Sequence, residues 1–430
     1  MNYNYQDKYL LEVNGRYDGS SKFPKSSRFG FFPSVSAGWQ IAQERFMNST
    51  RHWLDGLKLR ASYGVIGNQN INPYTFTPSM SVNNKATSWI IDDTYVTSIS
   101  SLPALVSQNF TWEKVGTINV GLDVNLFNNR LSGVFEWYQR NTNGMLAPGV
   151  QLPAVVGASA PYQNTADMRT RGWELSLNWR DQIGKVGYRI GFNLSDYKSE
   201  IIKYDDNAAT KLLSSYYPGQ TLGEIWGYVV DGYYTVDDFV DTSSWQLKEG
   251  VTSINGYNVR PGDVKFKNLR DDDTSTNVIT SGDNTFDNPG DRKVIGNTTP
   301  RYQYGINLGM NYAGFDLNVI LQGTGKRDYW ISNVLTFPMN GDNFVPLFEG
   351  LSDYWMPKDP DNGDWSAVNP NAKYPRIYGN RGNSGSNLRQ SDKYLSDASY
   401  LRIKNITLSY KLPKKWVNQI FLNQMKAFVS

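Results

Sequence analysis

The sequence predicts an all-β fold: a transmembrane antiparallel β-barrel of the outer-membrane type. Three observations support this prediction. Apolar and polar residues alternate with period two along the chain, one phase of that alternation carries no charge, and short connections alternate with long ones. The chain has 430 residues, of which 14% are aromatic. No run of about 18 apolar residues occurs, so strands rather than helices would cross the membrane.

Nine segments show the alternation clearly, and each is expected to form a strand. They are residues 9–17, 34–41, 57–65, 118–126, 131–138, 173–180, 188–195, 302–312 and 315–322. Their apolar phase holds no Asp, Glu, Lys or Arg. The charged residues on the opposite phase are Glu12, Arg16, Lys58, Arg60, Asp123, Glu136, Glu174, Arg180, Arg189 and Asp316. An uncharged face is expected where strands touch lipid, because a basic residue at mid-depth costs roughly 2–4 kcal/mol.

The connections between these segments supply independent evidence. Asn128 and Asn129 suit a tight turn, "RDQIGKVG" (180–187) is short, and "AG" joins 312 to 315. The connections at about 67–116, 142–170, 199–300 and 324–397 are long. Barrels of the outer-membrane type have short periplasmic turns and long outer loops. The long connections are therefore expected to lie together on the outer side.

Two further strands are expected near the C-terminus. Residues 400–412 switch phase, which predicts a bulge near Lys404 and Asn405. "MKAFVS" (425–430) begins another strand. About eleven strands result, and the last is cut short, so the chain is expected to be an incomplete barrel.

The composition argues against several other classes of protein. A net charge of +3 does not suit a nucleic-acid binder built on a basic patch. There is no Cys, and His52 is the one histidine, so neither thiol chemistry nor a Ser–His hydrolase motif is predicted. Carboxylate pairs for glycoside hydrolysis stay open by composition, although barrel and loop acids explain them more simply. We expect no enzyme.

Several ordered blocks resemble the SusC/RagA family of TonB-dependent outer-membrane transporters of Bacteroidota. They include "LKLRASYGVIGNQNI", "TWEKVGTINVGLDVNLFNNRLSG", "RGWELSLNW", "PGDVKFKNL" and "YLRIKNITLSYKLP". The resemblance implies a barrel of about 22 strands, an internal plug and a SusD-like lipoprotein lid. It also implies energy from the TonB complex and import of oligosaccharides or peptides. Residues 1–430 would be the C-terminal part of the barrel domain, since no block resembles the plug or a TonB-interacting segment.

We therefore expect part of a nutrient transporter in the outer membrane of a Gram-negative bacterium, in contact with outer-membrane lipid. Two alternatives stay open: a soluble or surface glycan-binding β protein, and a structural barrel without transport. The residues leave the substrate open, because loop specificity has no readable code.

The strand pattern also assigns side chains to the two faces of the barrel wall. Lys58, Arg60, Glu136, Glu174 and Arg180 are expected to face the lumen. They would line the solute path or bond to the plug. Leu131, Phe135, Trp137, Leu175 and Leu177 are expected to face lipid. Aromatic residues at strand ends, including Trp137, Trp173, Trp179 and Tyr302, are interpreted as interfacial girdle residues.

The loops contain two further candidate groups. Asp271, Asp272, Asp273 and Asp283 could supply oxygen ligands to Ca²⁺, although a hydrated acidic loop is the simpler interpretation. No other cofactor is predicted. Trp226, Trp245, Trp330 and Trp355 are candidates for contact with a ligand or a lid protein. The alternative is that these rings fill small cores within the loops.

Overall fold

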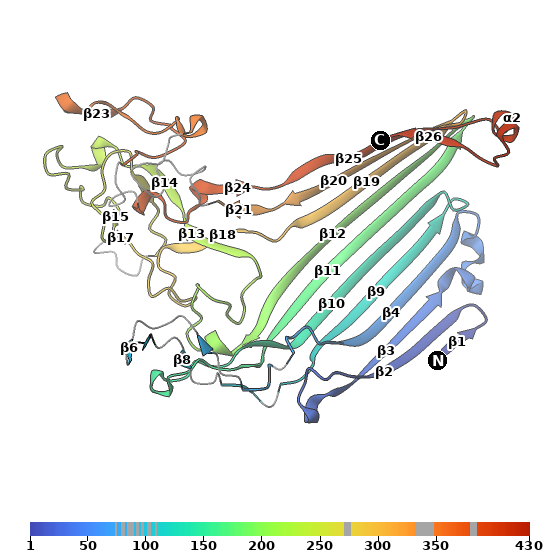
Figure 1. Ribbon diagram of the computed structural model, residues 1–430. Coiled ribbons are helices and arrows are strands. Elements are labelled where there is room, and N and C mark those ends of the chain that lie inside the picture. The colour runs from blue at the N-terminus through green and yellow to red at the C-terminus, as the bar shows by residue number, and fades with distance from the viewer. Residues whose placement is uncertain are drawn as a thin grey trace.

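The fold is built on one large antiparallel sheet (Figure 1). The computed structural model describes residues 1–73, 75–78, 82–83, 90–91, 94–95, 99–100, 105–107, 110–270, 277–331, 348–378 and 385–430. The twelve strands of the sheet are, in spatial order, β1 Asn2–Tyr5, β2 Tyr9–Gly19, β3 Phe29–Gln40, β4 Leu54–Asn68, β9 Glu113–Leu126, β10 Leu131–Pro148, β11 Tyr162–Ile183, β12 Val186–Tyr204, β19 Arg301–Tyr312, β20 Phe315–Lys326, β25 Tyr400–Lys411 and β26 Lys426–Val429.

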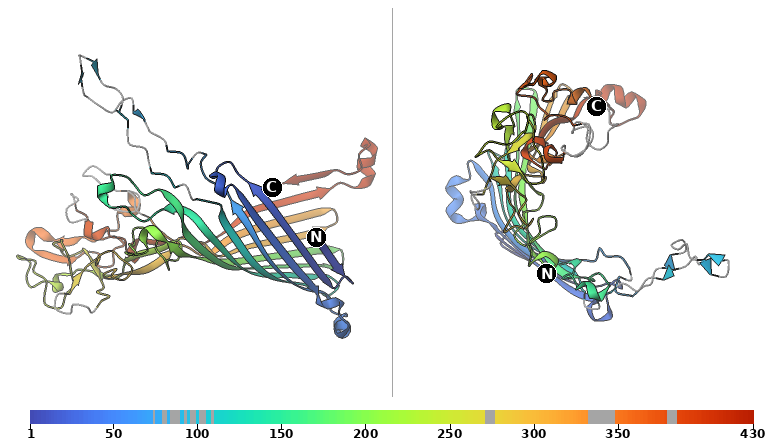
Figure 2. Two further views of the ribbon diagram at one scale, coloured as in Figure 1. Left: turned by 90° about the horizontal axis from the view of Figure 1, so that it is seen from below. Right: turned by 90° about the vertical axis from the view of Figure 1, so that its left-hand side faces the viewer.

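The strands follow one another through the sheet in chain order, so the topology is up-and-down. The sheet curves strongly across its strands, with β1 and β26 at its two edges (Figure 2). All eleven predicted strands are present, and β1 is additional. β1 escaped prediction because four residues are too few to show an alternation. Among the described residues, no helix is both long and apolar enough to cross a bilayer.

At one end of the strands, the connections are mostly tight turns. We call this rim of the sheet the short-turn edge. Asn128 and Asn129 both adopt the left-handed conformation, at φ 58° each, which asparagine tolerates better than most residues. Ala313 and Gly314 form a two-residue hairpin at φ 49° and 90°, between the paired residues Tyr312 and Phe315. Residues 6–8 and 184–185 also form turns, whereas 41–53 and 412–425 are longer helical connections.

The predicted bulge lies in β25. Asn405 pairs with Ile320 and Ile403 pairs with Leu321, so Lys404 is left without a partner on β20. One extra residue on one strand reverses the phase of every side chain beyond it. Leu401 and Ile403 therefore lie on the same face as Ile406 and Leu408, as the apolar pattern predicts.

Several strands run further than their apolar alternation indicated. β10 continues to Pro148 and β11 begins at Tyr162, so the expected loop 142–170 shrinks to residues 149–161. β11 and β12 also extend to a turn at 184–185. The added segments, such as "YQNTADMR" (162–169), are polar. No sequence pattern predicts them, because the apolar alternation ends where the strand leaves the apolar band.

The opposite edge carries the long connections, and we call it the long-loop edge. Small strands gather there at one end of the sheet (Figure 1). They are β5 Val82–Asn83, β6 Ile90–Ile91, β7 Thr94–Tyr95, β8 Ile99–Ser100, β13 Glu224–Tyr228, β14 Val230–Tyr233, β15 Ser253–Ile254, β16 Val264–Phe266, β17 Val278–Ile279, β18 Arg292–Asn297, β21 Asp328–Trp330, β22 Pro357–Asp359, β23 Asp364–Ala367 and β24 Leu395–Asp397.

Helices are few and short. Among the described residues they include α2 Lys414–Val417 and the 3₁₀ helices η1 Lys25–Ser27, η2 Ile41–Gln43, η3 Arg45–Thr50, η4 Ala154–Val156, η5 Asp205–Asn207, η6 Val236–Asp238, η7 Glu349–Leu351, η8 Pro360–Asn362, η9 Asp392–Tyr394 and η10 Asn418–Ile420.

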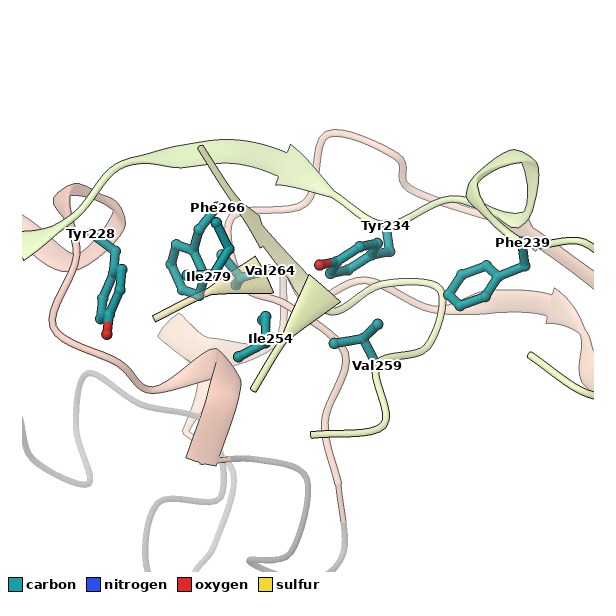
Figure 3. Close-up of a cluster of buried hydrophobic side chains, with 8 residues drawn as sticks. All are labelled: Tyr228, Tyr234, Phe239, Ile254, Val259, Val264, Phe266 and Ile279. Carbon is teal, nitrogen blue, oxygen red and sulfur yellow. The ribbon is translucent and has the colours of Figure 1, made fainter. Parts of the chain in front are cut away.

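The loop between β12 and β19 has its own hydrophobic core (Figure 3). Eight side chains form it: Tyr228, Tyr234, Phe239, Ile254, Val259, Val264, Phe266 and Ile279. Tyr234, Val264, Phe266 and Ile279 are fully buried, and the rings of Tyr228 and Phe266 lie 5.2 Å apart. The described residues between 205 and 300 therefore form a folded unit rather than an open loop.

Candidate functional site

The apolar face of the sheet is continuous from strand to strand. Phe135 pairs with Leu122 on one side and with Leu175 on the other. The same row of paired residues runs through Tyr5, Tyr9, Trp39, Leu59, Leu122, Phe135, Leu175, Leu194, Tyr304, Gly323 and Leu401. The row crosses eleven strands, from β1 to β25, without a charge, so one face is apolar across nearly the whole sheet.

The residues predicted to face lipid all lie on this apolar face. Leu131 pairs with Trp179, Phe135 with Leu175, and Trp137 with Trp173. Leu177 pairs with Gly133 in the neighbouring row. Phe135 remains 44% exposed and Trp137 39% exposed, although exposure of such apolar side chains to water is unfavourable.

The opposite face carries a network of charged side chains. The Arg60 guanidinium donates from Nε to the Asp123 carboxylate at 3.1 Å, and from an Nη to the Glu136 carboxylate. Glu174 lies directly opposite Glu136, and Lys58 lies directly opposite Asp123. The sheet thus brings together four of the five residues predicted to face the lumen.

Asp123 belongs to this network although it was not singled out as a site residue. Its charge lies on the polar phase of 118–126, and that signal could have identified it. Arg180 lies apart, near the short-turn edge, where its Nε donates to the Asn129 carbonyl at 3.3 Å.

Glycines give the arginines of this face room to lie flat. Arg60, Gly121 and Glu136 occupy one row on three successive strands, so Arg60 must cross Gly121 to reach Glu136. A Cβ on Gly121 would lie 2.8 Å from the Arg60 Cζ. The guanidinium would have to move away from such a Cβ, so the glycine leaves Arg60 room to reach Glu136.

The same arrangement recurs on the other half of the sheet. Arg189 pairs with Gly309, which pairs with Asn318. The Arg189 guanidinium reaches Asn318 Oδ1 at 3.4 Å and Asp316 at 3.4 Å, and a Cβ on Gly309 would clash with the Arg189 Nε. Each of these two arginines therefore lies flat across the neighbouring strand, at a glycine, and reaches an acceptor on the strand beyond it.

The polar face is also hollowed. One hollow of about 480 Å³ is lined by Glu12, Lys58, Arg60, Ser62 and Asn119 among others. Another, of about 440 Å³, lies near the short-turn edge and is lined by Arg180 and Arg189. Both hollows are open, and charged and amide side chains form part of each lining, so this face can hold water, a polar solute or a hydrogen-bonding protein segment.

The loop tryptophans lie in different surroundings. Trp226 donates its Nε1 to Glu224 at 2.8 Å, and Trp245 packs edge-on against Trp365 with ring centroids 5.0 Å apart. Trp330 packs against a small core of Leu351, Tyr374 and Tyr394. Trp355 is only 3% exposed and lies against Gly262. The Trp355 ring therefore fills a loop core, as the alternative interpretation expected, and is not presented at the surface.

Only one of the four predicted calcium ligands lies among the described residues. Asp271, Asp272 and Asp273 lie outside the described residues. Asp283 accepts a hydrogen bond from Thr285 Oγ1 at 2.8 Å, and this bond lowers the pKa of Asp283. Within the described ranges, no three His, Cys, Asp or Glu side chains are grouped so that they could hold a metal ion.

A buried carboxylate joins two of the long loops. Asp263 is fully buried and accepts hydrogen bonds from the Tyr378 hydroxyl, the Asn387 Nδ2 and the Arg260 backbone N–H, at 2.7–2.9 Å. The Asn387 Oδ1 accepts from the Val264 N–H at 2.8 Å. Burial raises the pKa of Asp263, and the hydrogen bonds oppose that shift. The loop of residues 205–300 is thereby fixed to the loop before β25.

Comparison with known proteins decides the family. The model of the TonB dependent receptor-like β-barrel family matches residues 1–424. The chain belongs to this family. Membership places it in the outer membrane of a Gram-negative bacterium, as predicted.

The relatives are longer proteins. TonB-dependent receptor P3 of Formosa agariphila is 29% identical over 448 residues, which cover 100% of this chain and 40% of that protein. TonB-dependent receptor SusC of Bacteroides thetaiotaomicron is 27% identical over 432 residues, covering 98% and 38%. The chain thus spans about two fifths of the length of these curated relatives.

A solved structure shows the same fold. A chain of the RagAB peptide importer in its closed-closed state superposes with a TM-score of 0.73 at 23% identity, covering 100% of this chain and 43% of that one. The open-open state gives a TM-score of 0.74. The resemblance to the SusC/RagA family and the β-barrel fold class are confirmed.

Proposed function

We propose that the chain forms the C-terminal part of the barrel of a TonB-dependent transporter that imports oligosaccharides or peptides. The observation that carries this proposal is the uncharged row across eleven strands, backed by a charged and hollowed opposite face. A wall of this kind suits lipid on one side and water on the other. Kinship with SusC and the fold of a peptide importer support import of a nutrient rather than catalysis.

The polar face would line the lumen, with Lys58, Arg60, Glu136, Glu174 and Arg180 directed into it. One arginine serves both Asp123 and Glu136, while Glu174 forms no ion pair among the described residues. Carboxylates opposite one another on adjacent strands repel each other, so this part of the wall suits a partner that offers donors. A plug segment would supply them and would also close a lumen that otherwise leaks.

The long-loop edge would face the outside of the cell. The loop between β12 and β19 is folded around a hydrophobic core, and Asp263 fixes it to the loop before β25, so these two loops can present a stable surface. We propose that a SusD-like lipoprotein lid covers this surface, that substrate is held beneath it, and that the TonB complex powers its release. Trp226 and Trp245 are the tryptophans we assign to contact with the lid or the substrate.

Paired substitutions on β10 test the orientation of the wall. Phe135→Arg should impair barrel assembly, because a basic residue within the hydrocarbon costs about 2–4 kcal/mol. Glu136→Gln, one residue along, should leave assembly intact because its side chain stays in water. Assembly is measured as the folded, heat-modifiable fraction in isolated outer membranes. Equal assembly of both variants would contradict this orientation.

Behaviour without detergent separates the barrel from a soluble glycan-binding protein. The exposed apolar rows should make the chain aggregate or precipitate in plain buffer. Size-exclusion chromatography in detergent and in its absence measures this. A monodisperse monomer in plain buffer would defeat the proposal.

A further inference from the structure

The apolar face becomes basic just beyond its aromatic residues. Trp137 pairs with Trp173, and two residues nearer the long-loop edge Gln139 pairs with Arg171. Arg171 in turn pairs with Lys198 on β12. Because strand side chains alternate, all five lie on the same face as Phe135. Both Arg171 and Lys198 are exposed to solvent.

These two cations have no carboxylate partner among the described residues. The Arg171 Nε donates to the Gln139 Oε1 at 2.8 Å, and Lys198 forms no ion pair. Asp196, the preceding residue of β12 on this face, is held through both carboxylate oxygens by Arg301. Like charges directly opposite on adjacent strands destabilise a sheet, so an Arg–Lys pair without a carboxylate partner favours the binding of an anion.

The neighbouring positions fit the same interpretation. Two residues nearer the long-loop edge, Arg169 pairs with Glu200, and the opposite charges of these two side chains balance. On β9, the exposed Lys114 pairs with Asn143 and adds a further cation to the face. The net charge of this patch is therefore positive.

The height of the patch indicates what the anion is. Two residues along a strand correspond to about 6–7 Å, which takes a side chain from an aromatic girdle in the interface to the level of the headgroups. Figure 1 shows β10, β11 and β12 continuing beyond the other strands toward the loops on this side. This step rests on the proposed function, in which the apolar face touches lipid and the long-loop edge is external.

We propose that Arg171 and Lys198 bind the phosphate of a lipid headgroup in the outer leaflet. Gln139 orients the guanidinium through its Nε and leaves both Nη groups free to hold phosphate oxygens. Lys198, across the strand pair, supplies a second charge to the same anion. The phosphate neutralises two cations that the sheet holds side by side, and it ties the barrel wall to the leaflet around it.

Paired variants of the membrane-assembled protein test this site. Arg171→Gln with Lys198→Gln removes the patch. Arg140→Gln with Lys185→Gln is the control, because it removes the same charge from the other face of β10 and from the turn at 184–185. Binding to phosphorylated and dephosphorylated lipid A is measured in detergent, with inorganic phosphate added separately as a competitor. The single variant Lys198→Gln replaces the double variant if the latter fails to assemble.

We expect the unmodified protein and the control to prefer phosphorylated lipid A at least tenfold. The double variant should lose that preference to within twofold, and Lys198→Gln should lose part of it. Inorganic phosphate at the lipid concentration should not compete. An unchanged preference in the double variant, or full competition by inorganic phosphate, would overturn the proposal.

A reporter on the apolar face separates the two levels of inference. A fluorophore at Phe135→Cys should be quenched by brominated lipid if the apolar face touches the bilayer. Quenching together with an unchanged lipid A preference refutes the phosphate site and leaves the orientation intact. An absence of quenching overturns both.

Discussion

On the polar face, the position of a long side chain depends on a glycine beside it. Arg60 reaches Glu136 because the residue between them, Gly121, has no side chain. The ion pairs are about one third exposed, and such pairs contribute little by themselves. Their value lies in fixing the position of charge on the wall, which a plug or a solute can then meet.

Substitution of Gly121 should disturb this network. Gly121→Ala places a Cβ 2.8 Å from the Arg60 Cζ, so the guanidinium must shift and its ion pairs weaken, which should cost about 0.2–1 kcal/mol. Gly116→Ala on the same strand is the matched control, because its Cβ would meet nothing closer than 3.7 Å. Urea unfolding of the refolded protein in lipid measures both variants. If Gly116→Ala costs as much as Gly121→Ala, crowding of Arg60 is not the cause.

At the scale of elements, the strands and turns were accessible from sequence and the loop contacts were not. Period-two alternation located nine strands, two more were expected near the C-terminus, and a phase switch located the bulge at Lys404, since these are local signals. The network around Arg60 could be predicted only in part, because its charges share a phase of the alternation but their pairing depends on the register of the strands. Asp263 and Asn387 are 124 residues apart in loops without periodicity, so nothing local announces their contact.

The long loops should separate when the Asp263 carboxylate is altered. Asp263 accepts from three donors, and Asp263→Asn would turn an amide N–H₂ toward at least one of them. Loss of hydrogen bonds to a buried charged group costs roughly 1.5–3 kcal/mol. Hydrogen exchange of residues 224–270 should become faster, whereas Asp361→Asn, at an exposed loop position, should leave it unchanged. Protection equal to that of the unmodified protein would contradict the role of Asp263.

The same carboxyl should make loop docking depend on pH. Burial raises the pKa of Asp263 in the folded loop, so its contribution is largest below the unfolded pKa of about 3.9 and is lost as pH rises through the folded value. Relative to Asp263→Asn, loop protection in the unmodified protein should therefore improve as pH falls from 7 to 4. A difference that stays constant over this range would show that the carboxyl does not titrate in the docked loop.

At the scale of the whole molecule, the curved sheet separates an apolar face from a charged one. Charge is absent from a row that crosses eleven strands, while ion pairs, hollows and flattened arginines occupy the other side. Neither face alone identifies a membrane wall, because a soluble sheet also has a polar and an apolar side. The combination with folded loops at one edge and tight turns at the other is what outer-membrane barrels require.

Cysteine scanning of residues 131–138 in membranes tests this central claim most directly. The chain contains no cysteine, so each introduced thiol is reported alone. Cysteines at Ser132 and Glu136 should react with a water-soluble, membrane-impermeant maleimide. Cysteines at Leu131, Phe135 and Trp137 should resist it and should instead contact lipid-borne spin labels. Equal reactivity at successive positions, or the opposite phase of labelling, would contradict a wall with lipid on one face and a lumen on the other.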